Sequence, residues 1–155
     1  MSFVADGDSN PFLVLDTTVL LYAVGSDHTF RAPCQRIVKA VQQGVLRATT
    51  TVEVIQEFAH VRAQRRDRKD AAELASAYID LLTPLLIVEA ADLRQGLRLF
   101  TQNPTLGSFD CVLAAATQAT GGTLVSADKA FSDAPRLHHI VPSNSSIAKL
   151  LGQVE

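Results

Sequence analysis

The hydrophobic positions along the chain fall into two alternating patterns. Short apolar runs bounded by polar residues occur at 12–15, 45–48, 85–88, 123–126 and 139–141. Runs of this length are typical of strands, and the unbroken ones are typical of strands buried on both faces of a parallel sheet. The sequence therefore predicts five strands.

Between these runs, apolar residues recur every three or four positions, which predicts amphipathic helices. Thr50 and Glu53 have the spacing of a capping box at the start of one helix. Leu93, Leu97 and Phe100 are expected to face inward from another. Strands that alternate with helices form a parallel sheet covered on both faces, so the predicted fold is a three-layer α/β/α sandwich with a mainly parallel central sheet. The predicted helices span 19–24, 30–43, 49–63, 71–82, 90–102, 108–120 and 143–151.

Length and composition place this pattern in one globular domain. The chain has 155 residues, of which 47% are hydrophobic and 19% charged. We expect a domain over 11–155 after a loose N-terminal lead at 1–10. The lead has no features of a secretory signal and no apolar run could span a bilayer, so we expect a cytoplasmic protein. Cys34 and Cys111 are expected to be buried free thiols.

Four acids stand near the carboxyl ends of predicted strands. Asp16 and Asp128 directly follow a strand, Glu57 lies one turn into the helix after the second strand, and Asp110 begins helix 108–120. Each has a structural explanation: a helix cap, a boundary glutamate or a favourable helix-dipole contact. Parallel strands end at one shared edge, however, and acids crowded there repel one another unless a cation joins them.

Oxygen ligands without a nearby histidine or cysteine suit Mg²⁺, with Mn²⁺ as a substitute. Such an ion keeps bound waters and accepts phosphate oxygens, which is the chemistry of metal-assisted phosphodiester hydrolysis. The net charge of −2 gives no general support for nucleic-acid binding. No Gly-rich loop ends in Gly-Lys-Ser/Thr, which excludes a P-loop NTPase. The four histidines show no metal spacing, and His139 is expected at the surface.

Four segments of the chain form an ordered set, at 13–20, 54–58, 109–116 and 124–131. Their order and spacing resemble those of PIN-domain ribonucleases, and most of all the VapC-type toxins of toxin–antitoxin pairs. The resemblance implies an acidic, Mg²⁺-dependent site that cuts single-stranded or looped RNA. It implies that Asp16, Glu57, Asp110 and Asp128 form the metal site, with Asp16 and Asp110 as direct ligands. Hydroxyls at Thr18 and Ser126 would support it.

The resemblance also implies a homodimer and a VapB-type antitoxin that neutralises the toxin, with DNA contacted only through that antitoxin. Many relatives carry a further acid where this chain has Ala130. Its absence favours one tightly held ion over a filled second metal site. The alternative function is a catalytically inactive PIN-like interaction module that acts through antitoxin and DNA-bound complexes.

A basic run lies between two predicted helices and is interleaved with Asp67 and Asp70. One explanation is a solvated connector. The other is a surface that contacts RNA phosphates or an acidic partner segment. The arginines concerned are Arg62, Arg65, Arg66 and Arg68.

Overall fold

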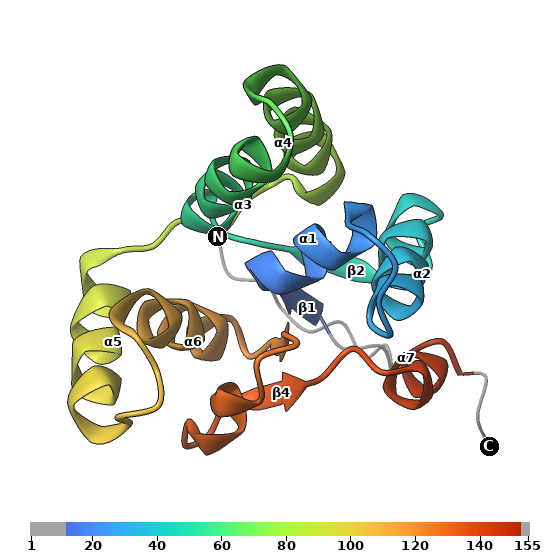
Figure 1. Cartoon of the computed structure of the whole chain (residues 1–155). Coiled ribbons are helices and arrows are strands. Elements are labelled where there is room, and N and C mark those ends of the chain that lie inside the picture. Colours follow the sequence, from blue (N-terminus) through green and yellow to red (C-terminus); the bar gives the residue numbers. More distant parts are fainter. Residues whose placement is uncertain (1–11, 153–155) are drawn as a thin grey trace.

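A computed structural model describes residues 12–152 of the chain (Figure 1). The lead predicted at 1–10 lies outside the described residues. Four parallel strands form one sheet in the order β2-β1-β3-β4. Leu13 on β1 pairs with Ala48 on β2 and with Thr123 on β3. The strands are β1 (Phe12–Leu15), β2 (Arg47–Thr49), β3 (Thr123–Val125) and β4 (His138–Ile140).

The two inner strands carry the centre of the core. Leu13, Val14 and Leu15 on β1 are fully buried, as are Leu124 and Val125 on β3. Helices cover an inner strand from both faces, so its side chains need no polar alternation. Burying each large side chain contributes about 1.5–3 kcal/mol. The prediction that run 12–15 is a buried parallel strand is confirmed.

The helices flank the sheet, and consecutive helices pack in pairs: α1 with α2, α3 with α4, and α5 with α6 (Figure 1). This arrangement confirms the predicted α/β/α sandwich. The helices are α1 (Thr17–Val24), α2 (Arg31–Gln42), α3 (Val52–Arg65), α4 (Arg68–Leu82), α5 (Ala90–Gln102), α6 (Ser108–Thr120), the short 3-10 helix η1 (Lys129–Asp133) and α7 (Asn144–Leu150).

The prediction of a strand at 85–88 is wrong. Leu86 makes one isolated parallel bridge with Thr51, and its amide donates to the Thr50 carbonyl at 2.9 Å. The neighbouring strand β2 ends at Thr49 and the chain enters α3 at Val52. Too little extended backbone therefore remains beside 85–88 for a ladder, and the sheet has four described strands instead of five.

The predicted capping box at Thr50 and Glu53 is also wrong. The hydroxyl of Thr51 accepts from the Val54 amide at 3.2 Å, so Thr51 caps α3. The hydroxyl of Thr50 instead donates to the Leu15 carbonyl at 2.6 Å. The cap therefore lies one residue later than predicted. The Thr50 side chain instead joins the end of β2 to the end of β1, and Glu53 is exposed.

Helix α5 faces the opposite way from the prediction. Leu93, Leu97 and Phe100 are 47%, 48% and 45% exposed, whereas Leu99 is buried. The contact with α6 passes through Gly96, where a Cβ atom would lie 2.7 Å from Cγ2 of Val112. The glycine lets the two helix backbones approach closely, and that contact turns the apolar row outward.

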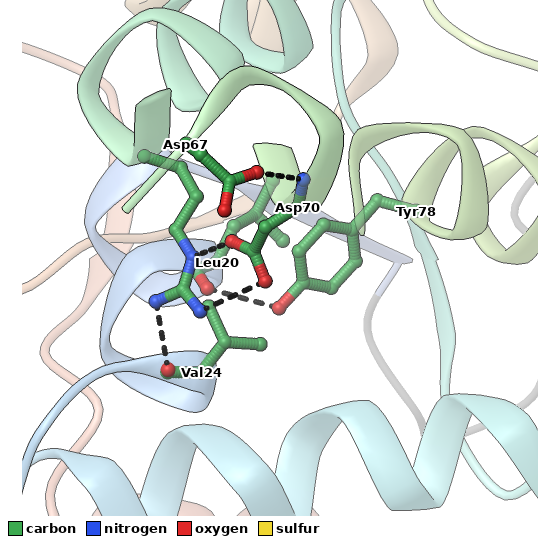
Figure 2. A network of polar contacts seen from close by, with 6 residues as sticks. Leu20, Val24, Asp67, Asp70 and Tyr78 are labelled. Carbon is green, nitrogen blue, oxygen red and sulfur yellow. Dashed lines mark hydrogen bonds and ion pairs between the residues drawn. The ribbon is translucent and has the colours of Figure 1, made fainter. Parts of the chain in front are cut away.

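The basic run is mostly helical, because α3 continues to Arg65 and α4 begins at Arg68. Asp67 caps α4 by accepting from the Asp70 amide at 2.8 Å. Arg62 is 9% exposed; its Nε donates to Oδ1 of Asp70 at 2.6 Å, and Nη1 donates to the Val24 carbonyl at 3.1 Å. Figure 2 shows these contacts beside the bond from the Tyr78 hydroxyl to the Leu20 carbonyl. Arg62 therefore joins α3 and α4 to the end of α1.

Two further predictions, that both cysteines are buried free thiols and that no apolar run spans a bilayer, can be compared with the described residues. Cys34 and Cys111 are buried free thiols, as predicted, and burial raises the pKa of Cys34 to about 12. Between residues 12 and 152, none of the helices has the length and apolar character needed to cross a membrane.

Candidate active site

Three of the acids singled out in the sequence, Asp16, Glu57 and Asp128, lie within electrostatic reach of the fourth, Asp110. Asp16 follows β1, Asp128 precedes η1, Glu57 lies on α3 and Asp110 lies in the first turn of α6. The ends of β1 and β3 are joined directly, because the Asp16 amide donates to the Val125 carbonyl at 3.0 Å. Burial, together with the charges of Asp16, Asp128 and Glu57, raises the pKa of Asp110 from 3.8 to about 6. The charges of the other three acids therefore disfavour the ionised form of Asp110.

Asp16 is the most enclosed of the four, at 6% exposure. Its Oδ2 accepts from the Ser126 hydroxyl at 2.7 Å and from the Thr18 hydroxyl at 3.0 Å. Its backbone occupies the N-cap position of α1, but its side chain caps no amide. Capping therefore does not explain this carboxylate, and the two predicted hydroxyls lie against it.

The same two hydroxyls also organise the loop after β3. The Ser126 hydroxyl accepts from the Asp128 amide at 3.0 Å, and the Thr18 hydroxyl accepts from the Ala127 amide at 3.0 Å. Ser126 is completely buried. One network of short polar contacts thus fixes the positions of Asp16 and of the backbone that carries Asp128.

Glu57 and Asp128 are exposed, and one carboxylate oxygen of each accepts a hydrogen bond. Thr17 donates to Oε2 of Glu57 at 3.2 Å, while Oδ1 of Asp128 accepts from the Ala130 amide at 2.9 Å, as its predicted capping role requires. Sequence reasoning chose Thr18 and overlooked Thr17. The available signal was that both hydroxyls directly follow Asp16.

Asp110 is half-buried, and no hydrogen-bond donor among residues 12–152 contacts its carboxylate. In the same part of the chain, no lysine, arginine or histidine forms an ion pair with any of the four acids. As the described side chains lie, no three of the acids, histidines or cysteines are gathered tightly enough to hold a metal ion. Carboxylates that repel one another are expected to stay apart and turn to neighbouring donors, as Asp16, Glu57 and Asp128 do.

His139 is less exposed than predicted. It is partly buried on β4, and its Nε2 lies 3.0 Å from the Ser126 carbonyl. Sequence reasoning missed this contact because the partner is a backbone atom of Ser126, which follows β3 and is distant along the chain. The histidine therefore touches the residue that holds Asp16.

Replacing Asp110 by asparagine is expected to stabilise the metal-free protein. The folded state raises the pKa of Asp110 above its unfolded value of 3.8. The charged carboxylate therefore destabilises the fold fully above pH 6, and the effect vanishes below pH 3.8. The shift corresponds to about 3 kcal/mol, which partial screening by water reduces to about 1–2 kcal/mol. Asp110→Asn should show this gain in urea unfolding with EDTA at pH 7.5 and lose it near pH 3.5.

Glu73→Gln is the matched control, since Glu73 is an exposed carboxylate on α4. It should leave the free energy of unfolding unchanged at both pH values. An Asp110→Asn protein that is less stable than the wild type at pH 7.5 in EDTA would mean that the carboxylate supports the helix and does not suffer repulsion.

Comparison with known proteins agrees with this geometry. The model of the PIN domain family matches residues 13–137. Ribonuclease VapC7 of Mycobacterium tuberculosis is 47% identical over 143 residues, which are 90% of this chain and 98% of the relative. Ribonuclease VapC23 of the same species is 32% identical over 115 residues, covering 73% and 89% of the two chains.

Solved structures share the fold at low sequence identity. VapBC2 from Rickettsia felis, bound to a DNA fragment from its promoter, aligns with a TM-score of 0.67 and 15% identity over 83% of this chain and 97% of the other. PAE2754 from Pyrobaculum aerophilum aligns with a TM-score of 0.65 and 14% identity over 98% and 97%. Together with the sequence match, these findings show that the chain belongs to the PIN domain family and, within it, to the VapC proteins.

Proposed function

We propose that this protein is a metal-dependent endoribonuclease and the toxin of a toxin–antitoxin pair. The observation that carries the proposal is that burial and the charges of Asp16, Asp128 and Glu57 raise the pKa of Asp110, with no basic side chain among the described residues paired to these acids. Likeness to two VapC ribonucleases over most of the chain supports the reaction class. Family membership alone does not require clustered charge, so the repulsion between these acids is the independent support.

The chemistry of the side chains fits a hard divalent cation. The site offers carboxylate and hydroxyl oxygens, which suit Mg²⁺ with Mn²⁺ as a substitute. Asp16 and Asp110 would be direct ligands, with Glu57 and Asp128 completing the site. When bound, such an ion lowers the pKa of a coordinated water and stabilises negative charge on the phosphate. Asp110 is half-buried and has no hydrogen-bond donor among the described residues, so a cation would stabilise its ionised carboxylate more than those of the other acids.

Hydroxyl groups of the chain itself would hold two of the acids in place. Ser126 and Thr18 hold one oxygen of Asp16 and leave Oδ1 for a ligand. Thr17 does the same for Glu57, where Oε1 remains available. Fixed carboxylates need little reorganisation during the reaction, which is the advantage of a preorganised site.

We keep Arg65, Arg66 and Arg68 as proposed contacts for RNA phosphates or for an acidic segment of a partner. All three are exposed at the turn between α3 and α4. Arg62 is withdrawn from this set, because its guanidinium is occupied by Asp70 and the Val24 carbonyl. Loss of an exposed arginine would weaken RNA binding and reduce its salt dependence.

We further propose that a VapB-type antitoxin neutralises the protein in the cytoplasm and that DNA is contacted only through this partner. The similarity to VapC proteins supports an antitoxin. The R. felis VapBC2 complex, which shares the fold, was solved on promoter DNA. A bulk charge of −2 gives the chain itself little attraction for DNA.

The apolar row on α5 is the proposed homodimer surface. Leu93, Leu97 and Phe100 lie on one face of the helix and are about half exposed. Leu97→Glu should convert a dimer to a monomer in size-exclusion chromatography with light scattering, because two buried charges would meet across the interface. Ile79→Glu, at a 40% exposed apolar site on α4, should remain dimeric. A dimeric Leu97→Glu protein would place the interface elsewhere.

The function is tested by incubating purified protein with single-stranded RNA. Cleavage should require Mg²⁺, stop in EDTA and return when Mg²⁺ or Mn²⁺ is restored in excess. The competing function is an inactive PIN-like interaction module. A protein that binds an antitoxin but leaves RNA intact under all of these conditions would establish that alternative.

A further inference from the structure

The peptide unit that joins Ser126 to Ala127 is held at both ends. His139 Nε2 lies 3.0 Å from its carbonyl oxygen, and its amide donates to the Thr18 hydroxyl at 3.0 Å. The carbonyl and the amide of one peptide unit lie in a single plane. Two contacts from opposite directions therefore fix the rotation of this plane.

That plane connects two of the acids. On one side, the Ser126 hydroxyl donates to Oδ2 of Asp16 at 2.7 Å. On the other, the chain continues to Asp128, whose amide donates to the same hydroxyl at 3.0 Å. Rotation of the peptide would displace the Ser126 hydroxyl and the Asp128 backbone together. A group that holds the peptide therefore controls the position of Asp16 relative to Asp128.

The His139 ring is itself held in one orientation. A carbonyl can only accept a hydrogen bond, so Nε2 carries the proton directed at Ser126. The other nitrogen, Nδ1, lies 3.1 Å from the Ser132 hydroxyl on η1. The ring also packs on fully buried Phe131, with 5.8 Å between the centroids. These contacts from η1 aim the imidazole at the peptide.

From this arrangement we infer that His139 is a positioning residue of the acidic site, in a role that rests on the proposed nuclease function. Its ring holds the Ser126–Ala127 peptide, and through Ser126 it sets the direction of the Asp16 carboxylate. In this role His139 acts through the peptide and needs no contact of its own with RNA or a cation. Ser132 and Phe131 on η1 contact the His139 ring and so hold it in place on the outer strand β4.

The experiment compares His139→Leu, which removes the donor, with His139→Gln, whose side-chain amide places a donor near the Nε2 position. His139→Leu should lower kcat for RNA cleavage about tenfold with KM for RNA within twofold, because partners behind metal-site groups typically contribute 10–100-fold. It should also raise the Mg²⁺ concentration needed for half-maximal cleavage. His139→Gln should restore most of kcat. His138→Leu, on the exposed neighbour in β4, should behave as the wild type.

Amide hydrogen exchange without metal or RNA provides a second readout. In His139→Leu, exchange of the Ala127 amide should accelerate at least tenfold, while the amides of Leu13 to Leu15 keep their protection. Acceleration throughout the sheet would indicate general destabilisation and overturn the inference. So would wild-type cleavage by His139→Leu, or failure of His139→Gln to recover. If the wild-type protein cuts no RNA, the nuclease proposal fails, whereas the exchange comparison still decides whether His139 holds the peptide.

Discussion

Asp16→Asn is expected to cleave RNA at least about 100-fold more slowly than the wild type at saturating Mg²⁺, the range found when one preorganised electrostatic group is lost from an active site. The substitution removes a negative charge at the end of β1. It retains an oxygen that can accept from Ser126 and Thr18, as the carboxylate does at 2.7 and 3.0 Å. The loss should therefore appear in kcat and in the response to Mg²⁺, with little change in fold.

The measurement is initial cleavage rate against Mg²⁺ concentration, with circular dichroism to verify folding. Glu73→Gln makes the same chemical change at an exposed position on α4 and should cut at the wild-type rate. Equal cleavage by Asp16→Asn and the wild type would assign the activity to a contaminating nuclease and remove the basis of the proposed function.

Arg62→Ala is expected to reduce the free energy of unfolding by about 2 kcal/mol, because partners on two other helices lose the nearly buried donor that joins them to α3. The Val24 carbonyl at the end of α1 loses its donor at 3.1 Å, and Asp70 loses its ion pair at 2.6 Å (Figure 2). The long arginine stem also leaves a gap where α3 meets α1. Asp70 itself stays partly exposed, which limits the penalty on the remaining carboxylate.

Urea unfolding at pH 7.5 measures this loss, with Arg65→Ala, an exposed change one turn along α3, as the control. A hydrogen bond from Arg62 and its charge lower the pKa of Asp70 below 3.8, so the ion pair stabilises the fold above that pH. The difference between Arg62→Ala and the wild type should therefore shrink as the pH falls below 3.8. Equal stability of the Arg62→Ala and Arg65→Ala proteins would show that the network is dispensable.

Periodicity predicted secondary structure well where burial is symmetrical. The run at Leu13 to Leu15 became a fully buried inner strand between β2 and β3. Periodicity failed at 85–88, where Leu86 is only 7% exposed but its neighbour Ile87 is 78% exposed. A strand needs a neighbour with free backbone as well as suitable side chains, and β2 is too short to provide it.

The outward face of α5 shows a second limit of pattern reading. An apolar row identifies a surface that avoids water but does not say what covers it. The close approach of Gly96 to Val112 directs the row of Leu93, Leu97 and Phe100 away from α6. Only the packing of the two helices distinguishes a core face from an exposed one.

By itself, the sequence determined the alternation of strands and helices and the buried parallel character of the inner strands, since these depend on local pattern. Strand ends also singled out Asp16, Glu57, Asp110 and Asp128 as candidates for the proposed site. The tertiary structure alone decided which donors hold each acid, where Arg62 points and how His139 reaches Ser126. These contacts join side chains to atoms distant along the chain, often to backbone groups that every residue carries. Such partners leave no mark in composition or spacing, so only the folded backbone could identify them.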